Sequence, residues 1–199
     1  MKDKRHPVFE KGFTVWLTGL SGAGKSTIAQ LLKSELEARN HDVELLDGDE
    51  VRKNLSSELG FSRKDRNANV RRIGWVAAMA TRHGAAVIVA AISPYRELRA
   101  EVRSQVGSFV EIYVKCPLNI LKHRDPKGLY GKAMTGDVKN FTGVSDPYEE
   151  PVNPDFIIDT SSESAIESTR RLIDVLSALG YTGAVQSPTS QIGFHGGRL

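Results

Sequence analysis

Apolar residues cluster along the chain in five short runs that are rich in β-branched side chains. These runs span Phe13–Thr18, Val43–Leu46, Ala86–Ala91, Phe109–Val114 and Asp155–Ile158. A short run with few polar positions is typical of a strand that is buried on both faces of a parallel sheet. The pattern therefore predicts five buried strands.

The segments between these runs carry apolar residues at helical spacing. Helices are expected at Lys25–Asn40, Arg63–His83, Pro94–Val106 and Ser164–Leu179. Strands that alternate with helices predict an α/β fold, with a parallel five-stranded sheet flanked by helices. In such a sheet, ligands bind beyond the carboxyl ends of the strands.

The segment Asp125–Pro154 breaks this pattern, because it is rich in Gly, Lys, Asp and Pro and is too long for an ordinary connection. It predicts a mobile lid, at about residues 126–145, with a merely disordered loop as the alternative. Residues 13–181 are expected to form one domain. Residues 1–12 are expected to be an N-terminal extension, and residues 182–199 a flexible C-terminal tail.

Composition narrows the function classes. The 199 residues are 40% hydrophobic and 26% charged, as in ordinary soluble proteins, and no apolar run approaches the length of a membrane span. Cys116 is the only cysteine, so a reducing, cytoplasmic environment is expected. The net charge is +3, but the arginines are scattered rather than forming one run. Small anionic ligands are therefore expected as partners, and nucleic acid and membranes are not.

The segment Gly19–Ser26 fits the pattern G-x-x-x-x-G-K-[ST] at every fixed position. It follows a predicted strand and precedes a predicted helix, which is the context that a phosphate-binding loop (P-loop) needs. Its backbone N–H groups and the helix N-terminus can surround phosphate oxygens. Lys25 can reach the β- and γ-phosphates, and the Ser26 hydroxyl can ligate Mg²⁺. The segment predicts binding of a nucleoside triphosphate.

Two carboxylates, Asp47 and Asp49, follow the second predicted strand. They can hold a water molecule on Mg²⁺, orient an acceptor hydroxyl, or accept its proton. Arg52, one helical turn further on, can pair with an anionic acceptor. A turn with a helix N-cap is the structural alternative, but the position at a strand end beside the P-loop favours chemistry.

Further candidates lie on the next two elements. On a helix, Arg66 and Asn69 point the same way, which suits a phosphate or sulfate group, although a solvated basic helix face is equally compatible. Ser93 ends the third strand and could cap the next helix, with Pro94 at the first helical position.

Two further sequence features do not indicate a functional site. The triplet His123–Asp125 matches the start of a protein-kinase catalytic loop, but Tyr130 stands where that loop requires Asn. The remaining histidines have no metal-ligand spacing and are expected at the surface; they are His6, His41, His83 and His195.

Together these motifs resemble the adenylyl-sulfate kinase family of P-loop NTPases. The resemblance extends over nearly all of residues 13–181. It is carried by Gly19–Thr27, Leu46–Arg52, Leu59–Arg72, Ile92–Arg96, Arg124–Tyr130, Phe141–Gly143 and Asp146–Glu149.

The resemblance implies ATP-dependent phosphorylation of the 3′-hydroxyl of adenosine 5′-phosphosulfate (APS). The products would be 3′-phosphoadenosine 5′-phosphosulfate (PAPS) and ADP, in sulfate assimilation. It implies ATP and Mg²⁺ as cofactors, with Mg²⁺ on Ser26 and, through water, on Asp47 or Asp49. It further implies a homodimer, and a relationship to fusions with sulfate adenylyltransferase.

The resemblance also assigns site residues. The implied ATP-binding residues are Gly19, Ser21, Gly22, Ala23, Gly24, Lys25, Ser26, Thr27, Arg124 and Thr160. The implied acceptor-binding residues are Asp49, Arg52, Phe61, Arg66, Asn69, Ile92, Ser93, Lys127 and Phe141. Within this set, Phe61 and Phe141 would sandwich the acceptor adenine, and Arg66 and Asn69 would bind the phosphosulfate. The implied catalytic residues are Lys25, Asp47, Asp49 and Ser93.

The chain departs from the family pattern at Ala68 and Trp75, where Glu is usual, and at Leu98, where Asp is common. These departures bear on acceptor affinity or oligomer contacts rather than on the reaction. Rival hypotheses are another small-molecule kinase on the same fold and a non-catalytic nucleotide-binding domain. The presence of Lys25 and Asp49 favours catalysis. A GTPase is disfavoured, because no Asn-Lys-x-Asp motif occurs.

Overall fold

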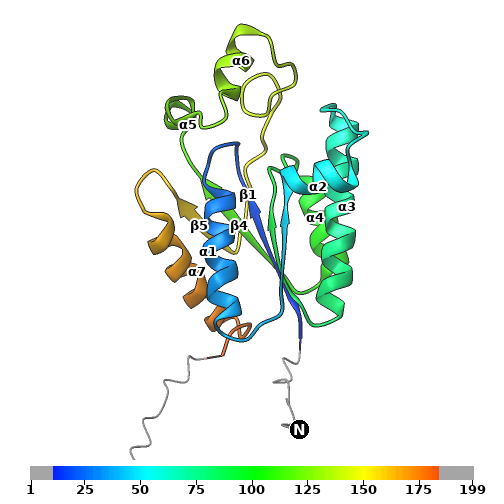
Figure 1. The fold of residues 1–199 in the computed structure, drawn as a ribbon, viewed down its shortest axis with the longest axis vertical. Coiled ribbons are helices and arrows are strands. Elements are labelled where there is room, and N and C mark those ends of the chain that lie inside the picture. Colours follow the sequence, from blue (N-terminus) through cyan, green and yellow to red (C-terminus); the bar gives the residue numbers. More distant parts are fainter. Residues whose placement is uncertain (1–10, 184–199) are drawn as a thin grey trace, which may run out of the picture.

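A computed structural model describes residues 11–183, which are built around a five-stranded parallel sheet (Figure 1). The strands are β1 (Phe13–Thr18), β2 (Val43–Asp47), β3 (Ala86–Ala90), β4 (Phe109–Lys115) and β5 (Phe156–Asp159). Their order is β2-β3-β1-β4-β5, and all neighbouring pairs are parallel. The predicted fold class is confirmed, and no strand boundary differs from the prediction by more than one residue.

Helices cover both faces of this sheet. They are α1 (Lys25–Glu37), α2 (Gly48–Leu55), α3 (Arg63–Arg82), α4 (Arg96–Val106), α5 (Leu118–Arg124), α6 (Leu129–Thr135) and α7 (Ala165–Ala178). The pair α1 and α7 packs on one face, and α2, α3 and α4 lie on the other (Figure 1). Within residues 11–183, no helix is both long and apolar enough to cross a membrane.

The alternation of side chains along β1 divides the core into two layers. Val15 and Leu17 are buried against the α1 side, where Leu32 lies. Trp16 between them is buried against the α3 side, where Ile73 lies. Because successive strand residues point to opposite faces, an uninterrupted apolar run is needed to fill both layers. Each of these buried side chains stabilises the fold by about 1.5–3 kcal/mol.

The segment expected to be a lid contains more structure than the sequence predicted. Helix α6 lies within it, and both α5 and α6 lie beyond the carboxyl ends of the strands (Figure 1). Tyr130 and Phe141 are buried, with ring centroids 5.0 Å apart in an edge-to-face arrangement. The Tyr130 hydroxyl donates to the Ser21 carbonyl at 2.9 Å. Single aromatic anchors of this kind produce no periodicity, so no sequence pattern indicates them. That this lid is mobile stays a prediction.

One surface prediction was wrong. His41 is buried, and its ring meets Phe13 edge-on at 5.7 Å. His83 is exposed, as expected. His6, His195, most of the N-terminal extension and most of the C-terminal tail lie outside the described residues.

Candidate active site

The turn between β1 and α1 has a backbone shape that only glycine suits. A Cβ atom on Gly19 would lie 2.3 Å from the Val114 carbonyl oxygen, so the loop could not pass β4 with a side chain there. Gly22 and Gly24 have φ values of 74° and 97°, which L side chains rarely adopt. Gly24 is the N-cap of α1, so the free backbone N–H groups of this helix open into the loop.

Lys25 lies folded into this loop, with 8% of its surface exposed. Its Nζ donates to the carbonyl oxygens of Gly19 at 2.9 Å and Leu20 at 2.8 Å. Burial, and then the charge of Lys127, lower the pKa of Lys25 to about 8. A phosphate bound in the loop would favour the protonated form. The lysine is therefore positioned to neutralise an entering anion.

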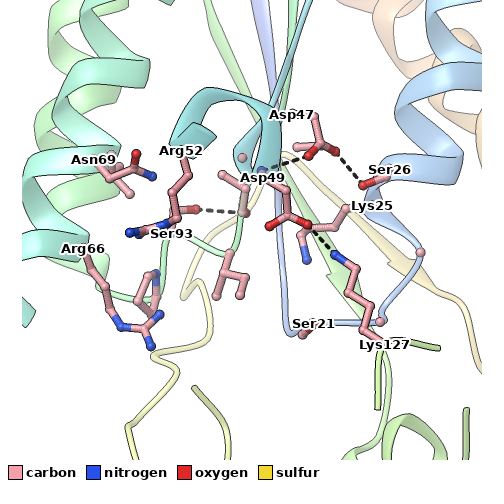
Figure 2. Close-up of a pocket in the computed structure, with 18 of the residues that line it drawn as sticks. Ser21, Lys25, Ser26, Asp47, Asp49, Arg52, Arg66, Asn69, Ser93 and Lys127 are labelled. Atoms are coloured by element: carbon pink, nitrogen blue, oxygen red, sulfur yellow. Dashed lines mark hydrogen bonds and ion pairs between the residues drawn. The ribbon is translucent and has the colours of Figure 1, made fainter. Parts of the chain in front are cut away.

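Asp47 joins the end of β2 to both the P-loop and α2 (Figure 2). One oxygen of its carboxylate accepts from the Ser26 hydroxyl at 2.6 Å, and the other accepts from the Asp49 N–H at 2.9 Å. Asp47 is thus the N-cap of α2 and a neighbour of the P-loop serine at once. Adjacent carboxylate and hydroxyl oxygens suit Mg²⁺. Among the described residues, no group of three or more His, Cys, Asp or Glu side chains is placed to hold a metal ion.

Asp49 points away from Asp47 and toward the lid. Its carboxylate forms an ion pair with the ammonium group of Lys127, which reaches in from the lid segment (Figure 2). Both side chains are exposed. Asp49 is therefore open to an incoming group, with a cation from the lid beside it.

A cavity of about 310 Å³ lies between the P-loop, the start of α2, the start of α3 and the lid. Most of the predicted site residues line it. They are Ser21, Gly22, Gly24, Lys25, Ser26, Thr27, Asp47, Asp49, Arg52, Phe61, Arg66, Asn69, Ile92, Ser93 and Lys127. Six further residues line the cavity that were not predicted as site residues, and none has a charged or polar side chain that could have identified it: Gly48, Val70, Ala90, Ala91, Pro94 and Pro126.

Five of the predicted residues do not line the cavity. Gly19 and Ala23 belong to the P-loop but are not part of the cavity lining. Arg124 donates to the Thr160 carbonyl at 2.7 Å, and the Thr160 hydroxyl donates to the Ala23 carbonyl at 3.0 Å, so this pair braces the loop. Phe141 is packed against Tyr130 instead of facing Phe61.

The acceptor-side residues form a basic pocket wall. Arg66 is buried, and it donates to the carbonyl oxygens of Phe61, at 3.0 Å, and Asn140. Its guanidinium also lies 3.8 Å from the Asp146 carboxylate. The Oδ1 atom of Asn69 is buried and has no hydrogen-bond partner. A buried acceptor without a partner is costly, which favours a ligand at this wall that donates a hydrogen bond to Oδ1. The amide nitrogen of Asn69 can in turn donate to an anionic group.

Phe61 is 56% exposed, and the Arg52 guanidinium lies 4.6 Å from its ring centroid. One ring face of Phe61 is thus covered by a cation. An exposed aromatic ring at a cavity edge offers a surface on which a planar base can stack.

Ser93 does not cap the next helix. Helix α4 begins at Arg96 with Tyr95 as its N-cap, so that expectation was wrong. The buried Ser93 hydroxyl accepts from the Trp16 indole N–H at 2.9 Å and donates to the Thr18 hydroxyl at 3.1 Å. Its φ is 40°, in the left-handed region. The hydroxyl is bonded into the sheet, which favours a positioning role over a reactive one.

A P-loop that faces two carboxylates at the neighbouring strand end, with a basic wall across one cavity, defines a P-loop kinase. The comparisons with known proteins identify the family. The model of the adenylylsulphate kinase family matches residues 11–159. The chain belongs to the adenylyl-sulfate kinase family.

Individual relatives agree with this. The chain is 53% identical to the adenylyl-sulfate kinase of Microcystis aeruginosa over 86% of its own length and 95% of that protein. It is 54% identical to "Probable bifunctional SAT/APS kinase 2" of Sorangium cellulosum, of which it spans only 29%. Among solved structures, the Mycobacterium tuberculosis APS kinase CysC in complex with AMPPNP and APS is 42% identical, with a TM-score of 0.80. That match covers 84% of this chain and 98% of the mycobacterial one.

Proposed function

We propose that this chain transfers the γ-phosphoryl group of ATP to the 3′-hydroxyl of APS, which yields PAPS and ADP for sulfate assimilation. The observation that carries the proposal is that the P-loop and the basic wall of Arg66 and Asn69 face one another across one cavity, with Asp49 between them (Figure 2). The 42% identity to a structure described with both AMPPNP and APS supports the same pair of substrates.

On the ATP side, Lys25 leaves the carbonyl oxygens that it now contacts and neutralises charge on the β- and γ-phosphate oxygens. Ser26 and Asp47 supply oxygens for Mg²⁺, which would polarise the phosphate when bound. Arg124 and Thr160 hold the loop in shape beside the expected place of the ATP adenine.

On the acceptor side, Arg66 and Asn69 bind the phosphosulfate group, and Asp49 orients or deprotonates the 3′-hydroxyl. Lys127 neutralises the negative charge of the Asp49 carboxylate and of the phosphoryl group that is transferred beside it. The acceptor adenine stacks on Phe61. A sandwich with Phe141 requires that this ring leave Tyr130 when the lid closes.

Three further proposals rest on the resemblance and on composition. The enzyme works with Mg²⁺, acts in the cytoplasm and forms a homodimer. A solved relative from Thiobacillus denitrificans, 40% identical with a TM-score of 0.67, is described as hexameric, so light scattering of the purified chain is needed to fix the assembly.

An acceptor screen tests the proposed function. ADP release should be measured with ATP, Mg²⁺ and one acceptor at a time: APS, adenosine 5′-monophosphate, shikimate or gluconate. We expect rapid APS-dependent release that is absent in Lys25→Ala. Faster release with another acceptor, or none with APS, would overturn the proposal.

A further inference from the structure

Arg99 lies in the first half of α4 and is a buried cation to which the proposed mechanism assigns no role. Only 2% of its surface is exposed. Its three guanidinium nitrogens donate to three separate parts of the chain, each at 2.7 Å. Nε donates to the Glu111 carboxylate on β4, Nη1 to the Ser93 carbonyl, and Nη2 to the Glu149 carbonyl. One side chain therefore joins the sheet, the cavity wall and the segment that follows the lid.

That segment, residues 146–150, is called the strap here. Besides Arg99, it is held by the start of α4: the Glu149 N–H donates to the Pro94 carbonyl at 2.8 Å, and the Arg96 N–H donates to the Glu149 carboxylate at 2.8 Å. The Tyr148 hydroxyl shares a hydrogen bond of 3.0 Å with Thr18 on β1. The strap is thus fixed to the core at the point where the lid ends.

We propose that Arg99 is a positioning residue that couples the Ser93 turn, which lines the acceptor part of the cavity, to the strap that anchors the lid. The proposal deepens the proposed function and rests on it. Ser93 adopts a left-handed φ of 40°, a strained conformation that persists only when its surroundings hold it. The charge-assisted bond from Arg99 to the Ser93 carbonyl supplies such a restraint.

The fork of the guanidinium explains why arginine is used here. Its nitrogens lie in one plane and point in fixed directions, so a single group can contact three partners at once. Glu111 fixes the plane of the Arg99 guanidinium, because its carboxylate accepts from Nε. The two terminal nitrogens then reach the carbonyl oxygens of Ser93 and Glu149. A lysine at this position would keep the charge but could not reproduce this geometry.

Arg103, one turn further along α4, provides a matched control. It contacts the same Glu111 carboxylate, at 3.5 Å, and the Asp155 carboxylate at 2.6 Å. The structure gives it no bond to Ser93 or to the strap. Because Arg103 is 37% exposed and Arg99 only 2%, a loss of stability alone would also affect the two variants unequally. The deciding readout is therefore the ratio of the KM for APS to the KM for ATP, which a loss of stability alone leaves unchanged.

The test compares Arg99→Lys with Arg103→Lys by steady-state kinetics. For Arg99→Lys we expect the KM for APS to rise roughly 2- to 30-fold, the range of coupling effects carried by residues that do not touch the ligand. The KM for ATP should change by less than about two-fold, because the P-loop is untouched. Arg103→Lys should leave both KM values unchanged. Equal changes in both KM values, or the same pattern in both variants, would overturn the proposal.

Hydrogen exchange of the ligand-free proteins gives an independent readout. In Arg99→Lys, exchange should become faster both at the Glu149 amide and at the amides of residues 91–95. In Arg103→Lys, exchange at these amides should not change. If wild-type protein does not phosphorylate APS, the proposed function fails, while this comparison still decides whether Arg99 couples the two segments. Unchanged exchange in either segment contradicts the coupling.

A second variant keeps the proposal testable if Arg99→Lys does not fold. Arg99→Met combined with Glu111→Leu removes both buried charges, which leaves no unpaired ion in the core. It should fold and show the same selective rise in the KM for APS. If neither Arg99 variant folds, Arg99 is a structural residue and the proposal is wrong.

Discussion

The Ser26 hydroxyl donates to the Asp47 carboxylate over 2.6 Å, which ties the first turn of α1 to the end of β2. Asp49, two residues later, contacts the lid cation Lys127 instead. The two carboxylates therefore occupy different sides of the cavity. This arrangement favours a metal role for Asp47 and an acceptor role for Asp49.

The first prediction separates these roles. Asp49→Asn should lower kcat by about 10²–10⁴-fold, the contribution of a general base, while both nucleotides still bind. The amide keeps the shape but loses the charge and the basicity. Steady-state kinetics and calorimetry measure the two effects.

Asp47→Asn is the matched comparison for Asp49→Asn. It should show a smaller loss of kcat, or one that raised Mg²⁺ relieves, because the amide keeps the N-cap of α2 but binds the metal more weakly. Full turnover in Asp49→Asn with loss in Asp47→Asn would mean that the two roles are reversed.

A second prediction concerns Lys25. Lys25→Ala should nearly abolish phosphoryl transfer while leaving the fold intact, because the lysine contributes on the order of several kcal/mol of charge stabilisation in the transition state. Circular dichroism and turnover should be measured on the same sample. A well-folded variant with near wild-type turnover would contradict the P-loop role.

The lowered pKa of Lys25 gives a third prediction, for the ligand-free protein. Between pH 8 and 10.5 the unfolded chain holds a proton on Lys25 that the folded chain has released, so this group raises stability as pH increases. From pH 7.5 to 9.5, wild type should gain about 2 kcal/mol relative to Lys25→Met in urea unfolding. Parallel stability curves for the two proteins would show that burial does not shift this pKa.

Arg66 is the subject of a fourth prediction. Arg66→Ala should weaken APS binding by roughly 1.5–3 kcal/mol, the contribution of a charge-assisted hydrogen bond, and spare ATP binding. Asn69→Ala should have a smaller effect in the same direction, because its amide is neutral. Calorimetry that shows ATP affinity lost and APS affinity kept would reverse the placement of the two substrates.

The fifth prediction concerns the lid. Amides of residues 127–145 should exchange rapidly without ligands and slowly when ADP and APS are bound, because closure excludes water from the reaction. The buried rings of Tyr130 and Phe141 anchor part of the lid to the core. The largest change is therefore expected between them. Equally slow exchange in both states would contradict a moving lid.

The sequence predicted the strands and the P-loop well, because each depends on local physics. A strand buried on both faces needs a continuous apolar run, and the P-loop needs glycines where φ is positive. Asp47 and Asp49 were placed correctly because the carboxyl ends of parallel strands lie at one edge.

The errors arose where distant contacts decide the local structure. Ser93 is bonded to Trp16, 77 positions away in the sequence, and this bond overrides its local preference for capping a helix. His41 is buried by Phe13, an aromatic partner on another segment. No short-range pattern indicates such contacts.

The position of the transferred phosphate tests the central claim most directly. The chain should be incubated with ATP, Mg²⁺ and APS, and the product examined by ³¹P NMR before and after treatment with a 3′-nucleotidase. We predict one new phosphomonoester, attached at the 3′-oxygen, that the nucleotidase removes to regenerate APS. A phosphate on any other atom, or ADP release without a phosphorylated nucleotide, would contradict the account.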